Sequence, residues 1–420
     1  MSIFDFDRFY EVWITITRNK VRSFLTGFGV FWGIFMLMIM LGAGHGLERG
    51  MLDNLEGFAT NSCFMWSSTT SEPYHGFQKG RYWDIRNKDL DILKKSIPEL
   101  DCLSPILWGG NSQNNIVYKD NFGSFQAYGV FANYNQVERQ SIKFGRFINE
   151  LDNIDERKVC VIGIKVYEEL FPKKENPIGC YVRIWGVYYQ VVGVVNNVSE
   201  ISLLGGQGEV IFLPFKTLQK VTNQGDVVHM LAATAKPDMP VSKLETKMKE
   251  VLKHNNHISP KDEQAVGSFN VEDIFNIFKY LFLGIAIVVW IVGSGTLIAG
   301  IIGVSNIMVV TVRERTKEIG IRRALGAKPR TIITQIMLET ITLTAVAGLL
   351  GLCLGVLCLH LADVYWLQNA ENMFIANPVV SFTTAVSSTF ILLFFGLLAG
   401  LIPANKAMKV KAIDAIRSDE

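Results

Sequence analysis

The sequence lacks the short motifs by which many enzymes and nucleic-acid-binding proteins are recognised. It holds no GxxxxGK[ST] phosphate-binding loop and no GxSxG nucleophile elbow. Its net charge is only +2 over 420 residues, without a basic stripe interleaved with aromatic residues, so no nucleic-acid partner is expected. His254 and His257 are spaced like a metal pair, but no third ligand lies near them in the sequence. We therefore expect no catalytic site, no cofactor and no metal site in this chain.

Cysteine is scarce, at six residues in 420. Cys353 and Cys358 lie in an apolar run, where a small and soft side chain is common. The other four lie in the soluble-looking middle of the chain without CxxC spacing: Cys63, Cys102, Cys160 and Cys180. If this middle part faces an oxidising compartment, one or two disulfides could form, but the sequence does not give their pairing.

Apolar residues are concentrated in four uncharged runs: Phe24 to Gly44, Tyr280 to Val310, Thr340 to Leu361 and Val379 to Ile402. A helix of about 20 residues is about 30 Å long, which is the thickness of the hydrocarbon core of a bilayer. A soluble protein would need an implausibly large core to bury all four runs. We predict four transmembrane helices, at residues 24–44, 280–310, 331–361 and 379–402, and regard the first as a retained anchor because its apolar core is too long for a typical signal peptide.

Basic residues beside these runs predict the orientation. Residues 1–23 hold four Lys or Arg, residues 311–330 hold seven, and the tail 403–420 holds four, whereas the connection 362–378 holds none. We expect both termini and residues 311–330 to face the cytoplasm, and residues 45–279 and 362–378 to face outward. The chain is then a multi-pass protein of a bacterial inner membrane.

Ionisable residues are almost absent from the four runs. Glu339 lies near the cytoplasmic start of the third run, and His45 and His360 lie at outward ends. Charged groups inside a membrane mark ion pathways and proton relays, so their absence argues against an ion-coupled transporter. We infer that the membrane part transmits motion rather than forming a polar substrate channel.

Glycines recur in the second and third runs, and Gly351 and Gly355 form a GxxxG pair. Such a pair allows two helix backbones to approach closely. Two interpretations remain open at this point, packing among the four helices of one chain and a seam between two chains.

The two cytoplasmic segments each have a helical pattern. In residues 1–23, Phe6, Phe9, Trp13 and Ile16 fall on one face, which predicts an amphipathic helix along the inner membrane surface. In residues 311–330, Arg315, Glu318 and Arg322 have the i, i+3 and i, i+4 spacing of helical ion pairs. Gly326 can end that helix and Pro329 can begin the next. This helical pattern indicates that residues 311–330 form a docking surface for a partner rather than a solvated, positively charged loop.

The outward part, residues 45–279, has the alternating patterns of a mixed α+β domain. We expect hairpins at 115–131, turning at 119–121, and at 180–196, turning at Trp185 and Gly186. Further strands are expected at 158–163, 209–213 and 227–234, and helices at 165–170 and 241–253. The predicted fold class is therefore an α-helical membrane protein with four transmembrane helices and an α+β extracytoplasmic domain.

Three stretches resemble a known family. Gly293 to Thr340, with ERTKEIGIRRALGA within it, resembles the permease core of the MacB/FtsX superfamily of ABC transporters. Residues 18–26 resemble the family's segment before its first span, and residues 403–417 resemble its closing segment. Residues 145–195 resemble the MacB-type periplasmic core domain. The resemblance covers essentially the whole chain.

The resemblance implies partners and a coupling site. In this family the charged helix between the second and third spans docks on an ATPase, a role carried here to Arg313, Glu314, Arg315, Glu318, Gly320, Arg322 and Gly326. Because only 23 residues precede the first span and no phosphate loop occurs, we expect a separate ABC ATPase subunit to hydrolyse the ATP. Membrane lipid, a second permease chain, identical or different, and a periplasmic adaptor or outer-membrane protein are the other expected partners.

The function implied is that of a permease subunit which carries ATP-driven conformational change across the inner membrane. Its far-side domain would then export or release a drug, a peptide or a lipoprotein. The alternative is a non-transporting sensor or signalling subunit, such as a regulator of cell-wall hydrolases, whose known relatives have smaller outward domains.

Overall fold

The computed structural model describes residues 20–55, 57–109, 115–172, 175–198, 203–206, 208–367 and 382–408. The chain forms two compact units, one of residues 1–51 with 280–420 and one of residues 52–279. The amphipathic helix expected before residue 20, most of the connection 362–378 and the tail from residue 409 lie outside the described residues.

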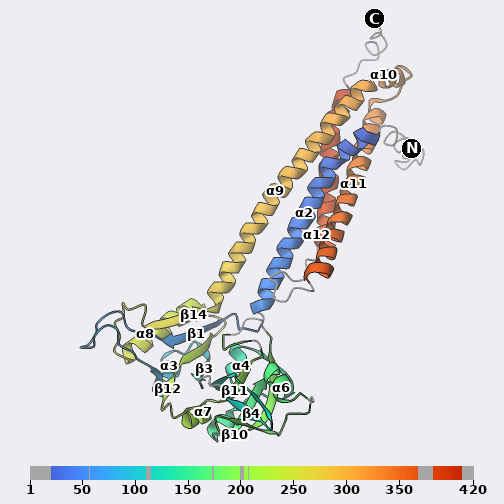
Figure 1. The fold of residues 1–420 in the computed structure, drawn as a ribbon. Coiled ribbons are helices and arrows are strands. Elements are labelled where there is room, and N and C mark those ends of the chain that lie inside the picture. The colour runs from blue at the N-terminus through green and yellow to red at the C-terminus, as the bar shows by residue number, and fades with distance from the viewer. Residues whose placement is uncertain are drawn as a thin grey trace. The chain divides into compact units, whose positions relative to one another are not determined.

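The first unit is built from long helices (Figure 1). These are α2 (Lys20–Leu55), α9 (Val271–Glu314), α11 (Pro329–Ala362) and α12 (Phe382–Met408), with the short α10 (Thr316–Ala324) and a π-helical turn, η1 (Asp363–Leu367). Each long helix contains a segment that is long and apolar enough to cross a membrane. The prediction of four transmembrane helices with an α+β domain is confirmed, although the helices extend beyond the predicted spans.

The helices bury small residues and expose large apolar ones. Trp290, Ile291 and Phe394 are more than half exposed, as expected of side chains that face lipid. At the buried contacts, a Cβ added to Gly351 would lie 2.6 Å from the Phe31 carbonyl oxygen, and one added to Gly355 would lie 2.8 Å from the Met38 Cβ. The GxxxG pair therefore packs α11 against α2 within one chain, which decides between the two interpretations of this motif.

The last helix runs further than its uncharged run. It passes through Pro403 and ends at Met408, although a proline inside a helix removes one backbone hydrogen bond. Ala399, Ala404 and Ala407 are almost fully buried. Their burial continues one packed face across the proline, which explains why the helix does not stop at Ile402.

The second unit is organised around one large sheet. The order of its strands is β14 (Val266–Asn270), β1 (Ser62–Ser67), β13 (Met230–Ala235), β3 (Leu100–Trp108), β6 (Gln126–Val130), β11 (Val210–Pro214), β8 (Val159–Gly163), β10 (Val187–Asn197), β9 (Tyr181–Ile184), β4 (Ile116–Tyr118) and β5 (Asn121–Gly123). β7 (Gln140–Gly145) also pairs with β10. β2 (Ile85–Arg86) and β12 (Val227–Val228) form a separate pair.

Helices cover both faces of this sheet. Along β1, Cys63 and Met65 point to one apolar cluster and Phe64 points to another, as the two-residue period of a strand requires. The first cluster is covered by α3 (Asn87–Ser96), α6 (Ile164–Leu170), α7 (Phe215–Val221) and α8 (Val241–Asn255), and α4 (Tyr134–Val137) contributes to the second. A short helix, α5 (Glu150–Ile154), precedes β8.

The turns agree with the predicted hairpins, with two corrections. β4 and β5 turn at Lys119 and Asp120, and Lys119 has a positive φ. β9 and β10 turn at Trp185 and Gly186, and both of these residues have a positive φ. The first hairpin is shorter than expected, because residues 126–130 leave it and pair with β3 and β11 instead. The strand expected at 227–234 is divided at His229, since residues 227–228 pair with β2 whereas 230–235 pair with β1 and β3.

All six cysteines are free in this structure. Burial raises the pKa of the Cys63 thiol to about 12 and that of the Cys102 thiol to about 11. Because the thiolate is the reactive form, these two side chains act as small apolar core residues.

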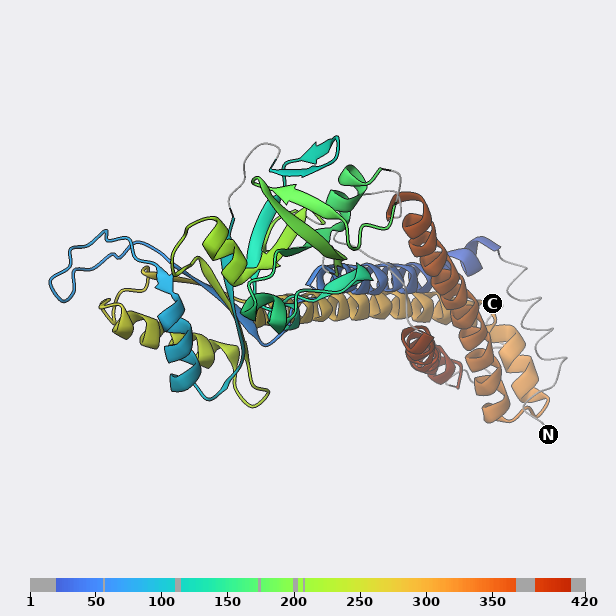
Figure 2. The same cartoon turned by 90° about the horizontal axis from the view of Figure 1, so that it is seen from below.

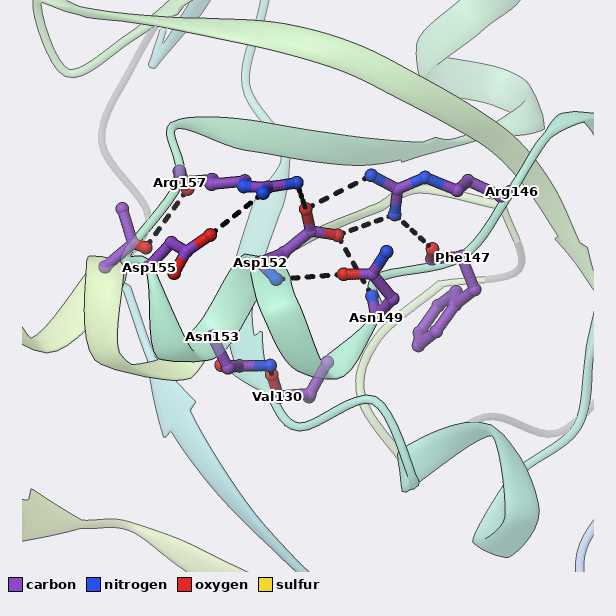
Figure 3. Close-up of polar contacts among 9 residues, drawn as sticks. Val130, Arg146, Phe147, Asn149, Asp152, Asn153, Asp155 and Arg157 are labelled. Carbon is purple, nitrogen blue, oxygen red and sulfur yellow. Dashed lines mark hydrogen bonds and ion pairs between the residues drawn. The ribbon is translucent and has the colours of Figure 1, made fainter.

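A buried carboxylate organises the segment between β7 and β8 (Figure 3). The Asp152 side chain is fully buried and accepts two hydrogen bonds from the Arg146 guanidinium, at 2.6 and 3.1 Å. It also accepts from the backbone N–H of Asn149 at 3.0 Å and lies 3.7 Å from the Arg157 guanidinium. Neighbouring Asn153 bonds the backbone of both Val130 and Phe215. This cluster fixes α5 to the end of β6 and the start of α7.

Candidate functional site

The candidate site is the turn that joins α9 to α11 through α10. α9 ends at Glu314, Arg315 takes the position before α10, and α10 ends at Ala324. Gly326 has a φ of +92°, a left-handed conformation that glycine adopts without strain. Pro329 occupies the first turn of α11, where its missing N–H is not needed. The predicted stop and start residues of this segment are both confirmed.

A chain of polar contacts ties α10 to α11. The Arg315 guanidinium lies 3.0 Å from one Glu318 oxygen and 3.2 Å from one Glu339 oxygen. The Arg322 guanidinium lies 2.9 Å from the other Glu318 oxygen and donates a 2.8 Å hydrogen bond to Gln335. Positive and negative groups alternate along this chain, so each charge has an opposite neighbour. We call Arg315, Glu318, Arg322, Gln335 and Glu339 the coupling network.

An apolar layer lies beneath the coupling network. Ile319 is 9% exposed and packs in the same cluster as Val312 and Ile336. Gly320 is also buried. On another side, the Arg323 guanidinium donates a 3.1 Å hydrogen bond to the Met408 carbonyl oxygen at the end of α12. The short helix is thus attached to α9, α11 and α12.

The opposite side of α10 is exposed and partly apolar. Lys317 is exposed, Ile321 is 46% exposed and Leu325 is 83% exposed. These residues follow one another at intervals of four, which places them on one side of a helix. We call them the outer face of α10. The same spacing can be read from the sequence, but the prediction was based on the charged residues of this segment and did not include Ile321 and Leu325.

The predicted coupling residues therefore divide into three groups. Arg315, Glu318 and Arg322 lie in the coupling network, and Gly320 lies in the buried layer. Arg313, Glu314 and Gly326 are exposed. The network residues point to contacts within the chain, whereas Ile321 and Leu325, which the sequence reasoning missed, are available for a partner.

The two histidines with the spacing of a metal pair are His254 and His257. Among the residues that the structure describes, no group of three or more His, Cys, Asp or Glu side chains is arranged to hold a metal ion. His257 instead lies beside His75, with ring centroids 5.8 Å apart.

The comparisons with known proteins agree with these two units. Residues 23–251 match the MacB-like periplasmic core domain, and residues 290–412 match the FtsX-like permease C-terminal domain. The chain is 28% identical over 413 residues to the macrolide export ATP-binding/permease protein MacB of Bdellovibrio bacteriovorus, covering 96% of this chain and 60% of that protein. It is 27% identical over 417 residues to the pyoverdine export ATP-binding/permease protein PvdT of Pseudomonas syringae pv. syringae, covering 99% and 60%.

The chain thus spans about 60% of the length of these curated relatives. Among solved structures, the periplasmic region of MacB from Actinobacillus actinomycetemcomitans aligns with a TM-score of 0.43 at 20% identity, over 55% of this chain and 97% of that one. The first family model covers more than half of the chain and the second covers most of the remaining spans. The chain therefore belongs to the MacB/FtsX-type family of ABC transporter permeases.

Proposed function

We propose that this chain transmits the motion of an ABC ATPase across the inner membrane and so drives export on the far side. The observation that carries this proposal is the design of α10. Its inner side is fixed to the membrane helices by the coupling network and Ile319, while its outer face exposes Ile321 and Leu325. A helix that is attached on one side and open on the other can pass a push from a bound partner to the spans.

The continuity of α9 supports the same mechanism. Its 44 residues form one helix from Val271 to Glu314, which at 1.5 Å per residue is about 66 Å long, roughly twice the thickness of a hydrocarbon core. Helical hydrogen bonds along the whole length make it stiff to compression. A displacement at Glu314 would therefore reach Val271, where the outward domain begins.

The cargo proposed is a small or medium-sized amphipathic compound, with peptides and lipoproteins as further candidates. The names of the two relatives above describe export of a macrolide and of pyoverdine. The lack of acidic and basic residues in the central part of each span supports a membrane part that moves rather than conducts. In this proposal the outward domain acts on the cargo in the periplasm.

The assembly proposed is a pair of permease chains with an ATPase dimer supplied by a separate subunit, within a bacterial inner membrane and with both termini in the cytoplasm. A periplasmic adaptor or outer-membrane protein would continue the route. The ATPase partner is the part of this proposal that membership in an ABC permease family supports most directly.

The outer face of α10 provides the test. Ile321→Glu and Leu325→Glu place a charge where an apolar contact is proposed, and Ile154→Glu, at an isoleucine 64% exposed in the outward domain, is the matched control. We expect the first two variants to lose the co-purifying ATPase and its transport activity while they insert in the membrane normally. If both retain the ATPase at the wild-type ratio, α10 is not the docking helix.

Orientation is tested by labelling. A membrane-impermeant maleimide should react with Cys180 in intact cells, whereas the cysteine of a Lys328→Cys variant, at an exposed position outside the outer face of α10 and in a background without the other cysteines, should react only after permeabilisation. Labelling of the Lys328→Cys variant in intact cells would reverse the topology and remove the transporter proposal. A regulator of cell-wall hydrolases would give the same labelling but no ATP-dependent efflux.

A further inference from the structure

A long connection between β1 and β2 projects from the outward domain. The connection comprises residues 68–84. Its residues 68–82, which we call the arm, extend beyond α8 and β1 in both views (Figures 1 and 2). Residues 75–80 are all exposed. A projecting loop of this length is usually either functional or without fixed structure, so its internal contacts decide between the two.

The base of the arm is fixed by one buried carboxylate. Asp262 accepts hydrogen bonds from the Ser71 backbone N–H at 2.7 Å, from the Ser71 hydroxyl at 2.8 Å and from the Glu72 backbone N–H at 3.2 Å. The Ser259 hydroxyl donates a 2.6 Å hydrogen bond to Glu72. These contacts join segments that are 187 to 191 residues apart in the sequence.

The arm is also ordered along its length. The Thr70 backbone N–H donates to the Arg81 carbonyl at 3.1 Å, and the Gly80 N–H donates to the Thr70 carbonyl at 2.6 Å. Nearer the tip, Tyr74 and Phe77 exchange backbone hydrogen bonds of 3.1 and 2.9 Å. The arm is therefore a backbone-bonded hairpin rather than a loose loop.

Arg81 holds the tip against the body of the domain. Its guanidinium lies 4.1 Å from the centroid of the Phe77 ring, a cation–π contact. The same group donates a 2.7 Å hydrogen bond to the Asn256 carbonyl and a 3.3 Å one to the His257 carbonyl. The Phe77 ring is thereby held in place although it is 44% exposed.

The arm presents aromatic and basic side chains to solvent. At its base, Tyr82 is 87% exposed, more than any other large apolar or aromatic residue among those described, and Lys79, three residues earlier, is exposed as well. Residues 73–82 contain Lys79 and Arg81 but no Asp or Glu. Aromatic residues and arginine are the residue types that most often supply binding energy at protein interfaces.

The topology places the arm away from the attachment of the membrane helices. In the β1–β14 pair, Cys63 lies opposite Asn270, and Ser67 lies opposite Val266. α9 follows Asn270 and the chain from α2 enters before Ser62, so both helices join the domain at one end of β1. The arm begins at the other end of that strand, about 20 Å away at 3.3 Å per residue. The arm and the two membrane helices therefore leave the sheet at opposite ends of this strand.

We propose that the arm is a pre-ordered docking hairpin for a folded protein in the outward compartment, whose surface makes apolar contacts with Phe77 near the tip and with Tyr82 at the base and faces Lys79 with acidic residues. The inference depends on the proposed function only for the outward location of residues 45–279. Because the hairpin is ordered before binding, association does not have to restrict its backbone. Charge complementarity selects an acidic rim over a basic one.

The test uses a photo-reactive benzoylphenylalanine at position 77 of the full chain, irradiated in native cells. The matched control carries the same group at position 122, since Phe122 is 56% exposed on β5 of the same domain. We expect an adduct with one outward-compartment protein at position 77 but not at 122. The Lys79→Glu and Tyr82→Ala changes, made at exposed side chains, should each reduce this adduct at least about tenfold. The attachment site on the partner should be apolar with Asp or Glu beside it.

Other outcomes overturn the inference. An adduct of twice the mass of this chain would assign the arm to a second copy, and adducts with lipid alone would assign it to the membrane. An adduct that Lys79→Glu leaves unchanged, or no adduct at all, would also contradict it. These results leave the loss of the ATPase in Leu325→Glu unaffected, so the arm and the proposed function fail separately. An adduct with a cytoplasmic protein would overturn both.

Discussion

The Nη1 atom of Arg315 lies 3.2 Å from the Oε2 atom of Glu339, across the turn between α9 and α11. The Glu339 side chain is only 8% exposed and the Arg315 side chain 26% exposed. A carboxylate so little hydrated is stable in its charged form only beside cationic or hydrogen-bonding groups. This contact therefore makes the position of α10 depend on the first turns of α11.

Removing one partner of this pair should lower the free energy of unfolding more than removing both partners does. We expect Arg315→Gln to lower the free energy of unfolding by about 2–3 kcal/mol, because the buried Glu339 charge loses a cationic partner. Glu318→Gln, at a side chain 44% exposed, should cost less than about 1 kcal/mol. The double variant Arg315→Gln/Glu339→Gln should recover part of the loss. Thermal unfolding of the detergent-solubilised chain measures all three, and equal effects of the first two variants would contradict the assigned roles.

Much of the membrane unit can be predicted from the sequence, because four long uncharged runs are stable in few structures other than membrane-spanning helices. Their ends were less predictable. α9 begins at Val271, nine residues before Tyr280, with the Asn270 side chain accepting a hydrogen bond from the backbone N–H of Asp273. That capping pattern is readable in the sequence, but the charged residues Glu272, Asp273 and Lys279 place the segment outside the uncharged run that defines the predicted span.

Contacts between segments that are far apart in the chain could not be predicted from the sequence. The Arg315–Glu318 and Glu318–Arg322 pairs follow from helical spacing, whereas Arg315–Glu339 spans 24 residues and depends on how α9 and α11 pack. The Asp262–Ser71 clamp of the arm spans 191 residues. In the same way, no pattern could decide whether Gly351 and Gly355 face a helix of the same chain, because that depends on where α2 lies.

Two glycines of α9 should respond differently to the same change. A Cβ added to Gly300 would lie 2.9 Å from the backbone of Gly29 on α2, whereas one added to Gly303 meets nothing within 4 Å. Gly300→Ala should force the two helices apart and destabilise the membrane unit by about 1–3 kcal/mol. Gly303→Ala should be neutral or slightly stabilising, since alanine favours helix. Resistance to unfolding in detergent distinguishes them, and a neutral Gly300→Ala would show that α2 and α9 do not approach this closely.

In the outward domain, replacing the buried carboxylate of Asp152 should destabilise the fold more than replacing the exposed carboxylate of Asp155. Asp152→Asn leaves the guanidinium of Arg146 facing a neutral amide, and we expect a loss of about 2–3 kcal/mol. Asp155→Asn removes a 2.8 Å pair with Arg157 in which both side chains are nearly half exposed, so its cost should be below about 1 kcal/mol. Urea unfolding followed by the tryptophan fluorescence of this domain compares the two. Similar midpoints for both variants would mean that Asp152 does not hold α5 to the sheet.

The pH dependence of the outward domain should reflect the same two carboxylates, Asp152 and Asp262. Burial alone would raise the pKa of each, but hydrogen bonds outweigh it and hold both below their usual range: Arg146 and the Asn149 N–H act on Asp152, and Ser71 with backbone N–H groups acts on Asp262. A carboxyl with a lower pKa in the folded state contributes stability above its unfolded pKa, near 4, and loses it as pH falls through the folded value.

We therefore expect the stability of the outward domain to be constant with respect to these groups from pH 7 to about 5 and to fall below about pH 4. Asp262→Asn should remove part of this acid dependence, and it should also release the base of the arm, so that protease cleavage between residues 72 and 82 becomes faster at neutral pH. The Lys143→Glu variant, at an exposed residue of β7 outside the arm, should leave both the acid profile and the cleavage rate unchanged. Acid titration of unfolding and limited proteolysis measure the two effects. If Asp262→Asn left the cleavage rate as it is, the carboxylate would not be what orders the arm.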